Sequence, residues 1–192
     1  MSHNRAVFLD RDGTINHDGG YTHRVEDLRL IDHVIDGLQL ISGMGFRLII
    51  TTNQSGIARG YFTEGDMKVF NRHLVEMLRS YSIGIDAIYH CPYHPTVGVG
   101  HYHRDSDCRK PKPGMLLQAA GDHGIDLAAS YVIGDKKSDT LAGQAAGCRT
   151  ILILTGAAGA GEVGLSARPD YVASNMLDAA SIIQHAGESR AE

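Results

Sequence analysis

Short, mostly apolar runs alternate along this chain with longer amphipathic stretches. The runs are apolar at consecutive rather than at alternate positions, and a strand of that kind is buried on both of its faces. We therefore expect an α/β fold with a three-layer, doubly wound, mainly parallel sheet. The expected strands are 6–9, 46–51, 87–91, 131–134, 150–154 and 171–173, and the expected helices lie near 33–43, 64–81, 114–123, 138–146 and 176–185.

Length and composition favour one domain. A chain of 192 residues with 43% hydrophobic and 21% charged residues can bury a sizeable core, so a single domain over 1–192 is expected. No internal repeat or interdomain linker is visible. The stretch 92–113 is rich in His, Gly and Pro and has no period, and a loop that long in a compact domain usually has a function.

Charge and cysteine content argue against several classes of protein. A net charge of −4 gives no sign of affinity for nucleic acid or for a membrane surface. The polar first residues lead directly into the first strand, and no apolar run approaches membrane-spanning length. The three cysteines are too few, and odd in number, for a secreted disulfide framework. We expect a cytoplasmic monomer that acts on a small molecule.

Asp10 and Asp12 stand at the point where the first apolar run breaks into a turn. Side chains alternate along a strand, so both carboxylates would reach toward its carboxyl end, where open α/β sheets bind ligands. Two carboxylates so close repel each other unless a cation lies between them or one is protonated. One can then be a nucleophile or metal ligand and the other a general acid. The alternative is a solvated acidic turn.

Polar and charged groups also follow the other expected strands. Asp10 and Asp135, with the main-chain carbonyl of Asp12, would supply hard oxygen ligands for Mg²⁺. Lys110, Thr52 and Asn53 could hold phosphoryl oxygens. Taken alone, each group could equally be a solvated turn or a strand end with an Asx turn, but their occurrence at four strand ends indicates a phosphate ester as ligand. These groups are Thr52, Asn53, Gln54 and Ser55, then Arg109 and Lys110, then Asp135, Lys136 and Asp139.

The order of these motifs resembles the haloacid-dehalogenase superfamily of phosphotransferases. DRDGT, TNQSG, RKP and GDKKSD follow one another within residues 5 to 155, with no insertion large enough for a separate cap domain. The longer strings FLDRDGTIN, TNQSGIARG and CRKPKPGM are similar to its heptose-bisphosphate and histidinol-phosphate phosphatases. The resemblance implies a haloacid-dehalogenase-like fold and a Mg²⁺-dependent phosphatase that removes the 7-phosphate of a heptose 1,7-bisphosphate. A histidinol-phosphate phosphatase, or another small sugar-phosphate phosphatase, is the alternative.

The resemblance also implies catalytic roles. Asp10 would attack phosphorus and become an aspartyl phosphate, and Asp12 would protonate the leaving oxygen and then activate water. Thr52 and Lys110 would hold the transferring group, while Asp10, Asp12 and Asp135 would bind Mg²⁺. Asp139 would support Lys110 or the metal site without being a direct ligand.

Substrate contacts are implied for a further set of residues. Arg109 is favoured for the phosphate that is not transferred, because its planar guanidinium can bind phosphate through two hydrogen bonds. The implied contacts are Asp18, Tyr21, Asn53, Gln54, Ser55, Arg109 and Lys136.

The long loop departs from the pattern of this group, which commonly carries a structural zinc on a Cys-x-His…Cys-x-Cys set. Cys91 and Cys108 match the outer ligands, but Tyr93 and Ser106 replace the inner two, and neither is a good zinc ligand. The histidines of the loop could substitute. The prediction is a half-complete zinc site, with Cys91 and Cys108 as ordinary small residues.

Three other interpretations fit less well. A receiver-like phosphoacceptor domain needs an aspartate at the end of its central third strand, where this chain has Cys-Pro, and a zinc-loop binding module lacks two ligands. Residues 159–164 match a dinucleotide-binding fingerprint, but no helix pattern opens there, as that motif requires.

Overall fold

Six parallel strands form the centre of the computed structural model, which describes residues 4–156 and 168–188. They are β1 (Ala6–Leu9), β2 (Arg47–Asn53), β3 (Ala87–Cys91), β4 (Tyr131–Gly134), β5 (Arg149–Ile153) and β6 (Tyr171–Ala173). The strand order is β3-β2-β1-β4-β5-β6, and each neighbouring pair is parallel. The predicted fold class is confirmed. The glycine-rich stretch 159–164 lies outside the described residues.

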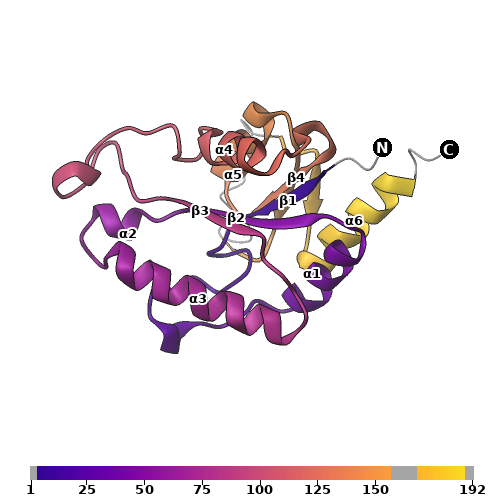
Figure 1. Ribbon diagram of the computed structural model, residues 1–192, viewed down its shortest axis with the longest axis horizontal. Helices are drawn as coiled ribbons and strands as arrows, with labels where there is room; N and C mark the ends of the chain where they lie inside the picture. Colours follow the sequence, from indigo (N-terminus) through magenta and orange to yellow (C-terminus); the bar gives the residue numbers. More distant parts are fainter. Residues whose placement is uncertain (1–3, 157–167, 189–192) are drawn as a thin grey trace.

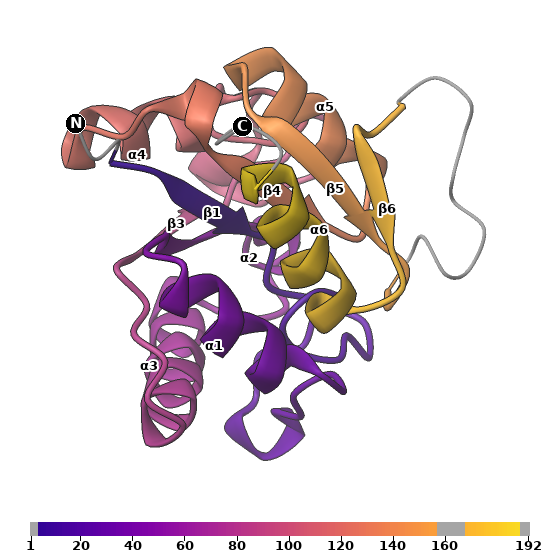
Figure 2. The same cartoon turned by 90° about the vertical axis from the view of Figure 1, so that its right-hand side faces the viewer.

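Helices cover both faces of the sheet (Figures 1 and 2). The α-helices are α1 (Val34–Gly43), α2 (Ser55–Ala58), α3 (Glu64–Ser80), α4 (Gly114–His123), α5 (Lys137–Ala146) and α6 (Met176–Glu188). Short 3-10 turns lie at Val25–Asp27, Gly100–Tyr102 and Leu127–Ala129. None of the helices in the described ranges combines the length and apolar character needed to cross a membrane. Helix α2 is an addition, because the sequence indicated only a strand end and a turn there.

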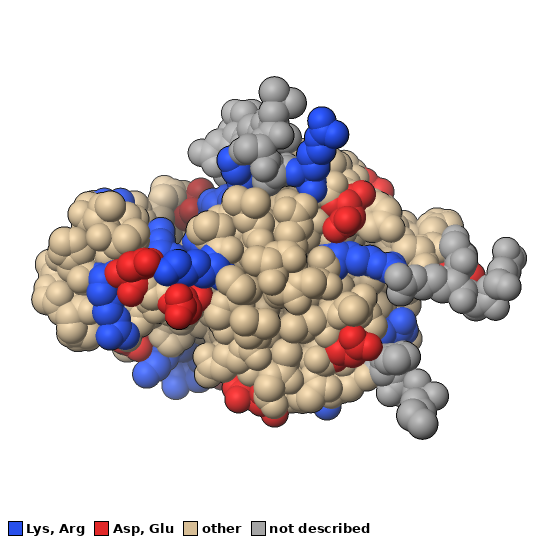
Figure 3. Space-filling model, turned by 90° about the horizontal axis from the view of Figure 1, so that it is seen from above, with Lys and Arg blue, Asp and Glu red and all other residues tan. Residues whose placement is uncertain are grey.

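The central strand β1 shows how the layers are built. Val7 and Leu9 pack into the core on the side of α1, α3 and α6, whereas Ala6 and Phe8 pack on the side of α4 and α5. All four side chains are fully buried, which explains why this strand is apolar at every position. Figure 3 looks onto the α4 and α5 side, where acidic and basic side chains are scattered around an uncharged area.

The sheet changes its winding direction at β1. The chain passes from β1 to β2 and β3 on one side, then crosses over to β4 on the other. At such a switch point the carboxyl ends of two adjacent strands open a crevice, and here these ends lead into Asp10 and Asp135. Beside this edge, α2 and the 92–113 loop project together from the body (Figure 1), joined by a hydrogen bond from Val99 N to Ala58 O of 2.8 Å.

Helices α1 and α6 approach closely at a glycine. A Cβ atom on Gly37 would lie 2.5 Å from the main-chain carbonyl carbon of Met176, so a larger residue at this position requires the helices to move apart. Gly43, the last residue of the same helix, has no atom within 4 Å of the corresponding Cβ position.

We therefore expect Gly37→Ala and Gly43→Ala to have opposite effects on stability. Gly37→Ala is expected to lower the free energy of unfolding by about 1–3 kcal/mol through overpacking. Gly43→Ala is expected to raise it by up to about 1 kcal/mol, because alanine loses less backbone entropy in a helix. Urea unfolding followed by circular dichroism measures both, and equal stability of the two variants would contradict the close packing of α1 on α6.

Candidate active site

A buried lysine joins three elements of the crevice. Lys110 is 3% exposed, and its Nζ lies 2.9 Å from Asp10 Oδ1 and 2.7 Å from the carbonyl oxygen of Thr51. The same ammonium forms an ion pair with Asp139 at the start of α5. A charge so deeply buried has to be paired, and Lys110 is paired on two sides.

This pairing governs the ionisation of Asp10. Burial by itself would raise the pKa of Asp10, but the charges of Lys110 and Lys136 and a hydrogen bond from Lys110 outweigh it and hold the pKa below 3.8. Burial alone would lower the pKa of Lys110, and the two carboxylates instead raise it. Burial and the charge of Asp10 raise the pKa of Asp139. Asp10 is thus the carboxylate that stays ionised and can act as a nucleophile.

Carboxylate oxygens gather around Asp10. Asp10, Asp135 and Asp139 each offer one oxygen, and the three lie within 4.8 Å of one another. A Cβ atom on Gly13 would lie 2.3 Å from Asp135 Oδ2, and one on Gly156 would lie 2.2 Å from the same atom. The two glycines therefore leave room for the Asp135 carboxylate, and the oxygen set suits a hard divalent cation.

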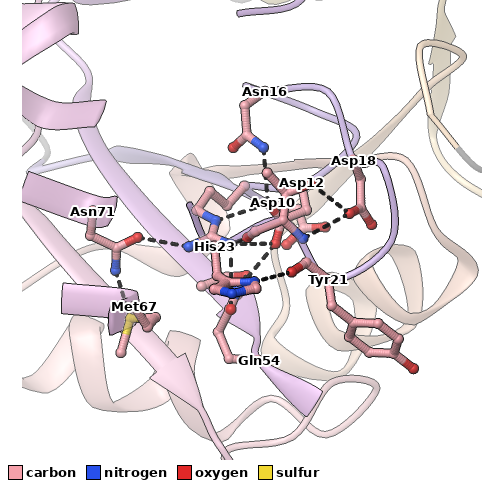
Figure 4. Close-up of polar contacts among 12 residues, drawn as sticks. Asp10, Asp12, Asn16, Asp18, Tyr21, His23, Gln54, Met67 and Asn71 are labelled. Carbon is pink, nitrogen blue, oxygen red and sulfur yellow. Dashed lines mark hydrogen bonds and ion pairs between the residues drawn. The ribbon is translucent and has the colours of Figure 1, made fainter. Parts of the chain in front are cut away.

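The Asp12 side chain turns to a separate set of donors (Figure 4). Arg11 holds it through two bonds, Nε to Oδ1 at 2.9 Å and Nη2 to Oδ2 at 2.8 Å. Asn16 Nδ2 and Gln54 Nε2 each donate to it at 3.0 Å. The main-chain carbonyl of Asp12 instead faces Lys136, whose Nζ is 3.4 Å away. The two aspartates thus have different surroundings.

Arg11 is the principal residue that the sequence reasoning missed. It is fully buried, with its guanidinium 4.5 Å from the Phe70 ring, and it also donates to Asn71 Oδ1 and to the Thr22 carbonyl. Its position between the two aspartates was the available signal. Its partners come from α3 and from the 17–23 segment, which no local pattern connects to it.

The last residues of β2, and Gln54 directly after it, line the crevice and also hold Lys110. Asn53 exchanges two hydrogen bonds with the main chain of Lys110, at 3.0 and 3.1 Å. Gln54 Nε2 donates to Thr52 Oγ1 at 2.9 Å, and Thr52 is 1% exposed. Two of the amides expected to contact substrate are therefore engaged in shaping the site.

The remaining predicted contacts lie around the same pocket, whose volume is about 360 Å³. Arg109 Nη1 donates to Ser55 Oγ at 2.9 Å and to the Tyr93 carbonyl at 3.0 Å. Lys136 Nζ lies 3.7 Å from Asp135 Oδ1 and 4.0 Å from Asp10 Oδ2. The pocket is lined, among others, by Asp10, Asp12, Asp18, Tyr21, Thr52, Asn53, Gln54, Ser55, Arg109, Lys110, Lys136 and Asp139. It thus brings together every predicted catalytic and substrate-contact residue.

Known proteins are similar to this chain in sequence and in fold. Residues 107–179 match the family model of HAD-hydrolase-like proteins. The D-glycero-β-D-manno-heptose-1,7-bisphosphate 7-phosphatase of Haemophilus influenzae is 43% identical over 183 residues, covering 94% of this chain and 97% of that protein. The chain belongs to the heptose-1,7-bisphosphate 7-phosphatase family. The protein of the same name from Pasteurella multocida is 48% identical over 153 residues, 79% of this chain and 83% of that protein.

A solved structure of this phosphatase family has the same fold. The D,D-heptose 1,7-bisphosphate phosphatase of B. bronchiseptica, complexed with magnesium and phosphate, superposes with a TM-score of 0.83 at 26% identity. The superposition covers 95% of this chain and 99% of that one. The resemblance to haloacid-dehalogenase phosphatases that the sequence indicated is therefore confirmed, and the chain is a phosphatase.

The half-complete zinc pattern lies at the base of the 92–113 loop. The Cys91 thiol hydrogen-bonds to Cys108, and Ser106 Oγ lies 3.1 Å from Cys108 Sγ. The Tyr93 ring is covered by the Arg104 guanidinium, 3.8 Å from the ring centroid. In this member of the phosphatase family, both replaced positions make direct contacts within the loop.

These contacts predict an unusually reactive Cys108. Hydrogen bonds from Cys91, first, and from Ser106 outweigh burial and lower the pKa of Cys108 to about 6. The thiolate is then the main form at neutral pH, so alkylation by iodoacetamide should level off near pH 7, whereas an ordinary thiol of pKa about 8.5 still gains reactivity above that pH. Peptide mass spectrometry across a pH series measures this.

Ser106→Ala provides the control, because it removes one of the two side-chain hydrogen bonds to Cys108. We expect its alkylation midpoint to shift upward. A wild-type midpoint near that of a free thiol would contradict the inferred thiolate.

Proposed function

We propose that this phosphatase hydrolyses the 7-phosphate of D-glycero-β-D-manno-heptose 1,7-bisphosphate through an aspartyl phosphate on Asp10. The observation that carries the proposal is the 43% identity to a phosphatase of that name over nearly the whole chain. The site supports it, because Asp10 is held ionised by the buried ammonium of Lys110, and an ionised carboxylate can act as a nucleophile. We further propose that the protein is a cytoplasmic monomer of one domain, because its free cysteines fit a reducing compartment.

In the first step, an oxygen of Asp10 attacks phosphorus while the bond from phosphorus to the sugar oxygen breaks. Asp12 gives its proton to that leaving oxygen. In the second step, Asp12 takes a proton from a water molecule as the water attacks phosphorus, which releases inorganic phosphate and restores the Asp10 carboxylate. Proton transfer of this kind contributes about 10²–10⁴-fold to a rate.

The surroundings of Asp12 fit this double task. Arg11 occupies both carboxylate oxygens in the structure, so one of them has to be released before it carries a proton. Asn16 and Gln54 keep the group oriented while that happens. Arg11 is therefore proposed as a positioning residue for Asp12.

Lys110 and Thr52 would hold the transferring phosphoryl oxygens, and Asp139 would keep the Lys110 ammonium in place. Mg²⁺, which would be held by the carboxylates of Asp10 and Asp135 and the carbonyl of Asp12, would supply positive charge for the phosphoryl oxygens. The carboxylate cluster and the space left by Gly13 and Gly156 support this assignment. Arg109 would bind the 1-phosphate.

A substrate comparison tests this function. Phosphate release from heptose 1,7-bisphosphate, heptose 7-phosphate and histidinol phosphate is measured in the presence of Mg²⁺, with Asp10→Asn as the control. We expect the highest kcat/KM for the bisphosphate and a loss of more than about 10⁴-fold in the variant, since it lacks the nucleophile. Undiminished turnover by Asp10→Asn would exclude the mechanism, and a preference for histidinol phosphate would transfer the function to the alternative.

We also propose that the 92–113 loop is closed without zinc. The contacts of Tyr93 with Arg104 and of Ser106 with Cys108 support this, because they occupy the positions that would otherwise carry the inner ligands. We expect protein purified without chelator to contain far less than one zinc per chain by atomic absorption, and its melting temperature to be unchanged by EDTA. One zinc per chain would overturn this proposal.

A further inference from the structure

Arg59 contacts two residues that line the pocket, Ser55 and Tyr21, and has no role in the reaction described so far. It follows the last residue of α2, and its main-chain N–H donates to the Ser55 carbonyl at 3.0 Å. Its guanidinium carbon is 5.7 Å from the centre of the Tyr21 ring. Tyr21 lines the pocket and its side chain points away from the Asp12 network (Figure 4).

Helix α2 places Arg59 and Arg109 near each other. Ser55, at the start of this four-residue helix, accepts a hydrogen bond from Arg109, and Arg59 follows its end. A helix rises about 1.5 Å per residue, so the attachment points of the two groups are only about 6 Å apart along it. Burial lowers the pKa of Arg109 most strongly; the cysteine thiols at the base of the loop raise it, and the charge of Arg59 lowers it. The two cations therefore act on each other.

The described carboxylates leave both guanidiniums without a salt bridge. Across residues 4–156 and 168–188, no acidic side chain forms a salt bridge with either Arg59 or Arg109. His94 stands close by, and burial together with the charges of Arg109 and Arg59 lowers its pKa, so it stays neutral near neutral pH. The Cys108 thiolate offsets part of the Arg109 charge. Arg59 forms no salt bridge within the described residues, so the two cations beside the pocket still favour an anion.

The Arg59 side chain also has an unused hydrogen-bond donor. Its Nε is buried and has no hydrogen-bond partner in the described part of the chain. A buried N–H of a charged group that lacks an acceptor destabilises the site until a ligand supplies one. Both side-chain hydrogen bonds of Arg109 are donated by Nη1. The N–H groups on Nε and Nη2 of its guanidinium are therefore available to a ligand.

We propose that Arg59 is a specificity-determining residue that binds, together with Arg109, the phosphate that is not transferred. This rests on the proposed function. Lys110 and Thr52 serve the phosphate at Asp10, and the guanidinium pair at the two ends of α2 serves the phosphate at the far end of the sugar. Tyr21 lines the pocket and its ring also adjoins the Arg59 guanidinium, so the ring can cover the sugar.

The test compares two substrates in three proteins. Wild type, Arg59→Gln and Arg79→Gln are assayed with heptose 1,7-bisphosphate and with heptose 7-phosphate, which lacks the second phosphate. Arg79 is exposed in the last turn of α3, so its variant carries the same charge change away from the pocket. Turnover of the monophosphate also reports whether each variant folds.

We expect Arg59→Gln to lower kcat/KM for the bisphosphate by about 10- to 100-fold, mainly through KM, because a hydrogen-bonded charge is lost. The loss for the monophosphate should be much smaller, so the ratio of the two kcat/KM values falls. Arg79→Gln should keep the wild-type ratio. Arg59→Lys, which retains the charge, should recover part of the loss.

An unchanged ratio in Arg59→Gln, with wild-type turnover of the bisphosphate intact, would overturn this inference alone. An equal loss on both substrates would show that Arg59 has a structural role and would overturn it as well. Absence of bisphosphate turnover by the wild type would instead overturn the proposed function.

Discussion

The buried ammonium of Lys110 is the group around which the rest of the site is arranged. A cation at 3% exposure is stable only with counter-charges, and Asp10 and Asp139 supply them from the ends of β1 and the start of α5. The pairing in turn keeps Asp10 ionised, which a nucleophilic carboxylate requires. Asn53 holds the Lys110 main chain by two hydrogen bonds, so the lysine is fixed from β2 as well. Lys110 thereby connects the 92–113 loop to the ends of β1 and β2 and to the start of α5.

The same logic separates two aspartates that stand two residues apart. Asp10 pairs with Lys110 and lies in the carboxylate cluster. Asp12 instead accepts hydrogen bonds from Arg11 and from the amides of Asn16 and Gln54. In the proposed function these similar side chains have different tasks because the charges around them differ. The buried Arg11 produces this difference in surroundings. Burying its charge costs desolvation free energy, which its hydrogen bonds to Asp12, Asn71 and Thr22 offset.

The sequence predicted the fold well because its signals were local. The expected bounds of β1, β3, β4 and β6 match the structure, while β2 runs on to Asn53, since its last residues pair with β3. Helix α2 escaped prediction because it is short and forms where Gly56 packs directly against Phe62. The convergence of the strand ends was predictable from topology alone. The burial of Arg11 was not, because its partners Asn71 and Gln54 lie far from it in the sequence.

Adjacent positions in the chain carry Arg109 and Lys110, and each side chain is fastened to a different element. Lys110 reaches β1 and Arg109 reaches α2. In the proposed function these neighbours bind opposite ends of one substrate, so a single peptide unit sets the span between the phosphate that reacts and the phosphate that stays. The pocket then selects its sugar by length: a bisphosphate on a shorter carbon chain could satisfy one of the two cations but not both.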